Sequence, residues 1–146
     1  GAERQPTSDC RQSLQQSPPF FANKNRAFWN LQFAGWGGAM VNRIAVAAGR
    51  ELAAAVSYYG PAPDPAEASK VEASIILQLA GNDARVNATA KPWGAALKAA
   101  GKDVAIYEYP GVEHAFNNDT SAERYNPAAA KLAWDRTMAL FDRKLR

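Results

Sequence analysis

The sequence predicts an α/β fold with three layers, in which a mostly parallel sheet is covered by helices on both faces. Two observations support this prediction. Short apolar segments alternate with segments of helical periodicity along residues 31–146, the order expected of strand–helix–strand units. The strand-like segments are apolar almost throughout, as strands are when a parallel sheet is buried on both faces. A chain of 146 residues is long enough to bury the core of one such domain.

Four strands are predicted, and most are bounded by glycine or proline. ASIILQLAG is the clearest, because β-branched residues lie at its centre and Gly81 ends it. LAAAVSYYG stops at Gly60 and DVAIYEYP stops at Pro110, whereas FWNLQF leads into the glycine-rich turn FAGWGGAM. The predicted strands cover residues 28–33, 52–60, 73–81 and 103–110.

Three helices are predicted from apolar residues three and four positions apart. The first, GAMVNRIAVAA, stops near Gly49, the second covers residues 88–100, and the third runs from about Pro127 to the C-terminus. The Pro-rich residues 61–72 are expected to form a surface loop. The expected apolar faces are Met40, Val41, Ile44, Ala45 and Ala48 on the first helix, Trp93, Ala96, Leu97 and Ala100 on the second, and Trp134, Met138, Phe141 and Leu145 on the third.

The N-terminal residues differ from the rest of the chain. Residues 1–30 are rich in polar residues and proline and show no sustained period, which is typical of a loop, a tail or disorder. We therefore predict an irregular N-terminal segment, residues 1–30, followed by the folded part, residues 31–146.

Composition narrows the classes of function. The net charge is +3 and no basic stripe is present, so nucleic acid is not an expected partner. Neither a signal peptide nor an apolar run near the ~18 residues of a membrane span is evident, so no membrane association is expected. The one cysteine, Cys10, fits a reducing compartment, and the expected location is cytoplasmic. One histidine without clustered cysteines cannot make a metal site, and no cofactor is predicted.

Three loops leave the carboxyl ends of predicted strands, where chemistry gathers in parallel sheets. They read FAGWGGAM, AGNDARVN and PGVEHAFNND, and they hold Gly35, Asp83 and His114. This is the chain order of an α/β-hydrolase: a strand–turn–helix that displays the nucleophile, then an acid, then a histidine. In such a site the histidine takes the proton of the nucleophile, while the acid fixes the tautomer of the histidine and stabilises its charged form.

From about residue 35 to the C-terminus the chain resembles the C-terminal half of the dienelactone hydrolase (carboxymethylenebutenolidase) family. The motifs that carry the resemblance are WGGAMVNRIA, VSYYGPAP, LQLAGNDARVN and YPGVEHAFNNDTSAERYN, ahead of a helix through LAWDRTMALFDRKL. Their order and spacing agree with the family. The resemblance implies a partial α/β-hydrolase fold and a hydrolase of small cyclic or activated esters, with Asp83 as acid and His114 as base.

The chain departs from the family pattern in two respects. The family elbow reads Gly-x-Cys-x-Gly-Gly with cysteine as the nucleophile, and alignment on WGG places Gly35 at that position. The oxyanion donor implied at the next residue is the N–H of Trp36. The family fold also has strands and helices ahead of the elbow, and residues 1–34 are too few to supply them. We expect a truncated fold whose open sheet edge favours self-association.

The candidate residues also have structural interpretations. Asp83 can cap the helix that follows it, a role compatible with that of a triad acid. A single histidine is often structural, so His114 has the same two interpretations. Neither Cys10 nor Ser57, inside a predicted strand, is expected to replace the nucleophile. Among the remaining candidates, Arg85 and Asn87 have two interpretations, the mouth of a pocket or a solvated loop, and the solvated loop is expected. Tyr58, Tyr59, Trp93 and Trp134 are expected in the core or a pocket wall.

Two classes of function stay open. The chain is either a hydrolase acting on a small ester or lactone, or a protein without catalysis. The second class comprises an inactive remnant and a module that binds a small molecule or another protein.

Overall fold

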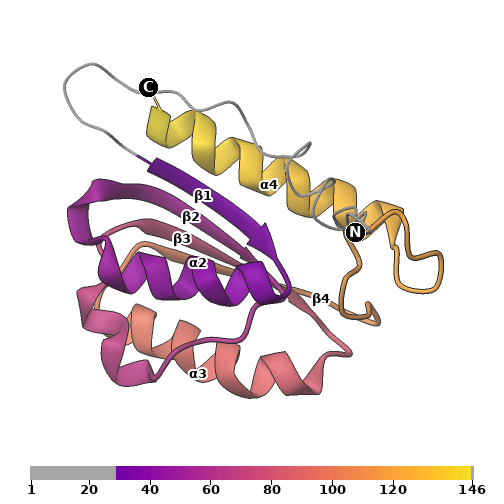
Figure 1. Ribbon diagram of the computed structural model, residues 1–146, viewed down its shortest axis with the longest axis horizontal. Helices are drawn as coiled ribbons and strands as arrows, with labels where there is room; N and C mark the ends of the chain where they lie inside the picture. The colour runs from indigo at the N-terminus through magenta and orange to yellow at the C-terminus, as the bar shows by residue number, and fades with distance from the viewer. Residues whose placement is uncertain (1–28, 146) are drawn as a thin grey trace, which may run out of the picture.

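A four-stranded parallel sheet forms the centre of the structure, a computed structural model that describes residues 29–145. The strands are β1 (Trp29–Ala34), β2 (Leu52–Tyr58), β3 (Ser74–Ala80) and β4 (Val104–Tyr109), and their order in the sheet follows the chain. Every neighbouring pair is parallel. All four strands therefore end at the same edge of the sheet (Figure 1).

The strand order places the helices in two layers. Successive crossovers that advance in one direction and share one handedness leave their helices on the same face of the sheet. Figure 1 shows α2 (Trp36–Ala47) and α3 (Ala84–Ala99) together on one face and α4 (Pro127–Leu145), which follows the last strand, on the other. The predicted three-layer α/β fold is confirmed.

The four predicted strands are present, with bounds that shift by one or two residues. Two connecting segments differ from expectation. Helix α3 begins four residues before the predicted start because the Asp83 side chain caps it. The loop predicted over residues 61–72 contains a 3₁₀ helix, Pro65–Lys70, which Asp64 caps by accepting a hydrogen bond from the N–H of Ala66. A further 3₁₀ turn, Gly49–Glu51, follows α2.

The predicted apolar faces are correct in part. On α2, Val41 and Ala45 are buried as predicted, but Met40 is exposed and the polar Asn42 is buried. Ala100 is exposed because α3 ends at Ala99.

On α4 the predicted stripe is confirmed at Phe141, wrong at Trp134 and Met138, and untested at Leu145. Trp134 is half-buried and Met138 is exposed, while the Leu145 side chain lies outside the description. Small side chains allow a helix to approach a sheet closely, which explains why the buried stripe is built mainly from them: Ala129, Ala130, Ala133, Thr137, Leu140 and Phe141.

Each face of the sheet carries its own core. Side chains alternate along β3, so Ile75 and Leu77 pack toward α2 and α3, whereas Ile76 packs toward α4. Trp93 is the largest fully buried side chain of the first core. The second core contains Phe116, from the loop that follows β4.

The predicted irregular segment, residues 1–30, lies almost wholly outside the described residues, and its boundary stays a prediction. Cys10 lies there as well. Along residues 29–145, no helix is both long and apolar enough to cross a membrane.

Candidate active site

The elbow is a sharp turn between β1 and α2. Strand β1 ends at Ala34 and α2 begins at Trp36, so Gly35 alone makes the connection. Its backbone has φ +59° and ψ −121°, a conformation in which a residue with a side chain is strained. The Gly35 N–H donates to the carbonyl of Tyr58 over 3.0 Å, which ties the turn to the end of β2.

Close backbone contact holds this turn against β2. A Cβ added at Gly38 would lie 2.6 Å from the carbonyl oxygen of Tyr58 and 2.9 Å from the Cα of Gly60. A Cβ at Gly60 would lie 2.3 Å from the carbonyl carbon of Gly38. Glycine is therefore required at both positions, and the second glycine of WGG has a packing role. The hydroxyl of Ser57 donates to the Gly38 carbonyl over 3.0 Å, so this serine braces the same contact.

Asp83 lies between β3 and α3, and its two carboxylate oxygens have different partners. Oδ1 accepts a hydrogen bond from the N–H of Val86 over 3.1 Å and caps α3. Oδ2 lies 2.5 Å from Nδ1 of His114. The side chain is almost fully buried. The helix cap therefore fixes the carboxylate while its second oxygen meets the histidine.

His114 belongs to the loop after β4, and its two ring nitrogens face different groups. Nδ1 meets Asp83, and a carboxylate at that position favours the proton on Nδ1, which leaves the lone pair on Nε2. The edge of the Tyr59 ring packs against the imidazole with 4.9 Å between ring centroids. About a third of the side chain, 32%, is exposed, so the ring is supported and still open to solvent.

The structure brings all three predicted positions together. A Cβ placed on Gly35 would lie 3.8 Å from Nε2 of His114. Gly35, Asp83 and His114 follow three different strands, and the common edge where these strands end is what gathers them. Trp36 is the first residue of α2, where N–H groups have no acceptor within the helix. Its side chain is 81% exposed.

Among the remaining candidates, the Tyr59 ring contacts His114. Arg85 is exposed. The prediction of a solvated position is wrong for Asn87, because this residue is buried in α3 and its Nδ2 donates to the carbonyl of Ala80 over 2.9 Å. Tyr58 and Trp93 are buried, as predicted. Among the described residues, no three His, Cys, Asp or Glu side chains form a group that could hold a metal ion.

Sequence reasoning missed two supports of the site. Tyr59 adopts φ +37° and so turns its ring toward His114. Asn42, buried in α2, donates from Nδ2 to the carbonyl of Pro61 over 3.1 Å and ties α2 to the chain after β2. The sequence did contain a signal for Asn42, because it is a polar residue within the apolar stripe of α2. No local feature of the sequence indicates that Tyr59 supports the histidine.

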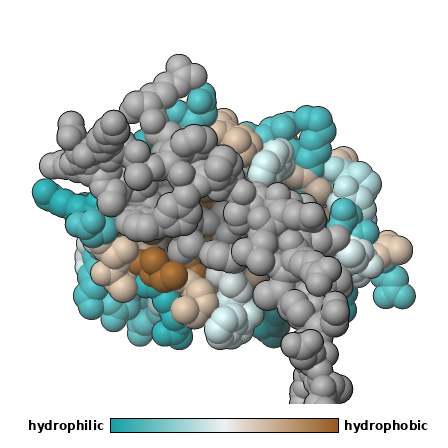
Figure 2. Space-filling view, turned by 45° about the horizontal axis from the view of Figure 1, so that its top comes forward, coloured by the Kyte–Doolittle hydropathy of each residue, from teal (hydrophilic) through white to brown (hydrophobic). Residues whose placement is uncertain are grey.

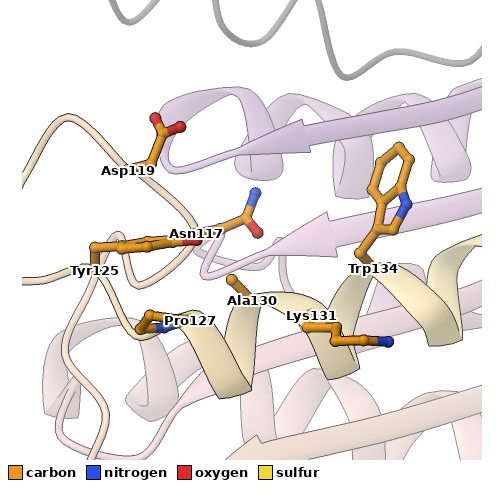
Figure 3. Close-up of a pocket in the computed structure, with 7 residues that line it drawn as sticks. All are labelled: Asn117, Asp119, Tyr125, Pro127, Ala130, Lys131 and Trp134. Carbon is orange, nitrogen blue, oxygen red and sulfur yellow. The ribbon is translucent and has the colours of Figure 1, made fainter.

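A separate cavity of about 280 Å³ lies between the loop after β4 and the first half of α4. In Figure 3, Tyr125 and Asn117 approach it from the loop and Trp134 stands on the helix. Trp134 therefore lines a pocket wall, as the sequence analysis allowed. The lining residues are Asn117, Asp119, Tyr125, Pro127, Ala130, Lys131 and Trp134.

The parallel sheet, the sharp elbow and the paired acid and histidine at the strand ends define an α/β-hydrolase architecture. The family model of the "Dienelactone hydrolase family" matches residues 34–145. This chain belongs to that family.

Individual relatives agree with the family match. The chain is 35% identical over 89 residues to a "Putative carboxymethylenebutenolidase" of Saccharolobus solfataricus, which covers 60% of this chain and 34% of the relative. It is 35% identical over 102 residues to a protein of the same name from Azospirillum brasilense, covering 68% of this chain and 44% of that one. The crystal structure titled "Putative Dienelactone Hydrolase" from Klebsiella pneumoniae is 29% identical with a TM-score of 0.70, over 77% of this chain and 51% of that chain. The chain thus spans between a third and about half of the length of these relatives.

Proposed function

We propose that this chain carries the acid and the base of a carboxylic ester or lactone hydrolase, with glycine at the position that displays the nucleophile. One observation carries the proposal. Nδ1 of His114 meets Asp83 at 2.5 Å, and Nε2 of the same ring lies 3.8 Å from the Cβ position of Gly35. A side-chain oxygen or sulfur at position 35 would lie within reach of the base.

Each group has a defined role in this proposal. Nε2 of His114 removes the proton of the nucleophile and later activates the water that releases the acyl group. Asp83 holds the ring and stabilises its charged form. The Trp36 N–H, at the N-terminus of α2, donates to the oxygen that becomes negative when the carbonyl is attacked. The expected substrate is a small ester or lactone, in line with the names of the relatives.

Glycine at position 35 has a direct chemical consequence. It supplies no atom that can attack a carbonyl, so we propose that the unaltered chain forms no acyl–protein intermediate at the elbow. No other described residue fills the space between Nε2 and position 35, which leaves it available to a ligand. This favours a second candidate function, in which the site binds a small ester, lactone or carboxylate without covalent turnover.

The first test restores the nucleophile. Gly35→Cys is expected to take up an acetyl group from p-nitrophenyl acetate, measured as a burst of nitrophenolate and as an acetyl mass increase on the peptide that contains position 35. The strained backbone should cost about 1–3 kcal/mol of stability, so circular dichroism must first confirm folding. The unaltered chain, which holds Cys10, is the matched control for acylation of a thiol elsewhere.

The base must be required for this gain. His114→Ala in the Gly35→Cys background is expected to lower the acylation rate by about 10²- to 10⁴-fold, the usual contribution of general base catalysis. A folded Gly35→Cys protein that acylates no faster than the unaltered chain would contradict the proposal and favour the inactive remnant.

The second candidate predicts binding without turnover. Titration calorimetry with an unreactive lactone should then show saturable binding to the unaltered chain and weaker binding to His114→Ala. Equal heats for the two proteins would rule out a ligand at this site.

We also propose that the open edge of the sheet makes the chain associate with a second copy of itself. Within the described residues, β1 pairs only on its β2 side, and an unpaired strand edge is a template for another strand. Light scattering that gives a monomer mass at all concentrations would contradict this proposal. A proline at Gln32, within β1, should lower the association if β1 pairs directly.

A further inference from the structure

The position of Gly35 leaves room directly in front of the base. Apart from its chain neighbours, Nε2 of His114 is the one described heavy atom within 4 Å of a Cβ built on Gly35. Among the described residues no atom blocks a side chain here, and the strained φ of +59° is what resists one. By contrast, Gly38 and Gly60 are packed against backbone atoms at less than 3 Å. Of these three glycines, only Gly35 has room for a Cβ.

The base that faces this room is already oriented. Asp83 meets Nδ1, Tyr59 supports the ring, and the helix cap holds the carboxylate in place. None of these contacts uses Nε2. The His114 side chain is 32% exposed, so part of the ring faces solvent.

The histidine beside this space determines which class of small molecule can act as a nucleophile there. A group that attacks a carbonyl at neutral pH must give up a proton to imidazole and be strongly nucleophilic. Small primary amines are already protonated at this pH, and alcohols ionise far less readily than thiols. Thiols ionise near pH 8.5 and are intrinsically very nucleophilic. A thiol with a short, unbranched carbon chain is also narrow enough to lie where a side chain would.

We propose that the site uses a free small thiol as its nucleophile and transfers an acyl group from an ester to that thiol. This inference rests on the proposed function, because it uses the same base and acid. Nε2 of His114 takes the thiol proton while sulfur bonds to the ester carbonyl carbon. The carbon–oxygen bond of the ester then breaks, the proton passes from Nε2 to the departing oxygen, and the products are a thioester and an alcohol. No oxidant or reductant takes part, and Gly35 is the feature that admits the thiol.

The experiment measures thioester formation with 2-mercaptoethanol as the thiol and p-nitrophenyl acetate as the ester. After subtraction of the reaction without protein, the unaltered chain should release nitrophenolate at a rate that saturates with thiol concentration. Mass spectrometry should identify the S-acetyl product. Glutathione, which is equally a thiol but much larger, should give less than a tenth of this protein-dependent rate.

Two variants locate the reaction. His114→Ala should remove at least nine-tenths of the protein-dependent rate. Gly35→Ala adds only a methyl group in front of Nε2 and should lower the rate at least fivefold. Ala47→Gly, an exposed change at the far end of α2, should leave the rate within twofold.

The outcomes separate this inference from the proposal on which it rests. If Gly35→Cys acylates with help from His114, but the unaltered chain shows no thiol-dependent rate, the inference is wrong and the proposed function stands. Protein-dependent hydrolysis without thioester would overturn the inference in favour of water as the nucleophile. A rate unchanged in Gly35→Ala would also overturn it, because the thiol would then react elsewhere. If folded Gly35→Cys is not acylated, both the proposed function and the inference about the thiol are wrong.

Discussion

The two faces of the sheet are built by different means. Under α2 and α3 the clustered side chains are apolar, Trp93 leaves Nε1 without a hydrogen-bond partner, and the buried Asn42 and Asn87 donate to backbone carbonyls. The core under α4 contains hydrogen bonds between side chains: Tyr109 donates to Oε1 of Gln78 over 2.7 Å, and the hydroxyls of Tyr58 and Thr137 lie 2.8 Å apart. Apolar burial is non-directional, whereas buried hydrogen bonds select one arrangement.

The residues of the site are also divided between the two faces of the sheet. The elbow and Asp83 lie at the starts of α2 and α3, on the apolar face. His114 lies in the loop whose Val112 and Phe116 pack into the other core. The loop of the base is therefore anchored in the core under α4, whereas the elbow and the acid begin the helices on the other face. Figure 2 shows mainly hydrophilic residues on the coloured part of one face, as expected where the apolar side chains pack inward.

The largest expected effect lies on the apolar face. Trp93→Ala should lower the free energy of unfolding by about 3–5 kcal/mol, the usual cost of truncating a buried aromatic residue. Urea unfolding followed by circular dichroism measures it. Trp36→Ala is the matched control: its side chain is 81% exposed, so the change should be within about 0.5 kcal/mol. Similar losses in both variants would contradict an apolar core on this face.

The contact between the elbow and β2 should be nearly as sensitive. Gly38→Ala is expected to cost about 3 kcal/mol, at the upper end of overpacking, because the new methyl group meets backbone atoms that cannot rotate away. Gly49→Ala serves as comparison. Its Cβ would meet no described atom within 4 Å, and its φ of +52° is what resists the change, so about 1 kcal/mol is expected. Equal urea midpoints for the two variants would show that the elbow and β2 can move apart to accommodate the added methyl group.

The hydrogen bonds under α4 should contribute less each. Tyr109→Phe removes the donor to Gln78 and the acceptor for Arg136, which lies 3.1 Å from the hydroxyl. The expected loss is about 1–2 kcal/mol. Tyr125→Phe, on a more exposed ring, should be nearly neutral in the same urea experiment. In the Gly35→Cys background, Tyr109→Phe should also slow acylation if this network orients the loop of His114.

A small effect is expected at the onset of tyrosine ionisation, near pH 10, from two tyrosines on the α4 face. Burial raises the pKa of Tyr58 well above its ordinary value of 10.0, against a smaller opposing contribution from the Thr137 hydrogen bond. Burial also raises the pKa of Tyr109. Above about pH 10 the unfolded chain loses these protons and the folded chain keeps them, so the free energy of unfolding falls as pH rises, by at most ~1.4 kcal/mol per pH unit for each tyrosine.

Tyr58→Phe tests this alkaline dependence. The variant loses the bond to Thr137 and starts from lower stability, but its stability should fall less steeply with pH than that of the unaltered chain. Urea titrations at several alkaline pH values give the slopes. Parallel slopes would show that Tyr58 ionises equally in the folded and unfolded chain.

Much of the fold could be predicted from the sequence because its signals are local. The apolar runs between glycine and proline define the strands, and the rule that parallel strands end at one edge predicted that the three loops converge. Where the prediction failed, the reason was tertiary. Trp134 and Met138 form a plausible helical stripe, yet alanines on the neighbouring stripe of α4 pack on the sheet because small residues permit a closer approach. Asn87 looked solvated, but α3 begins early enough to bury it.

The alternation of strands and helices, the glycine turn, and the order in which Gly35, Asp83 and His114 follow their strands can all be read from the amino-acid sequence. The distances between these three residues depend on how the chain folds in three dimensions. Gly35 and Asp83 are 48 positions apart and Asp83 and His114 are 31 apart, and no local propensity extends over such separations. The register of the sheet, the cap that anchors Asp83 and the ring of Tyr59 together place Nε2 of His114 in front of a residue that has no side chain.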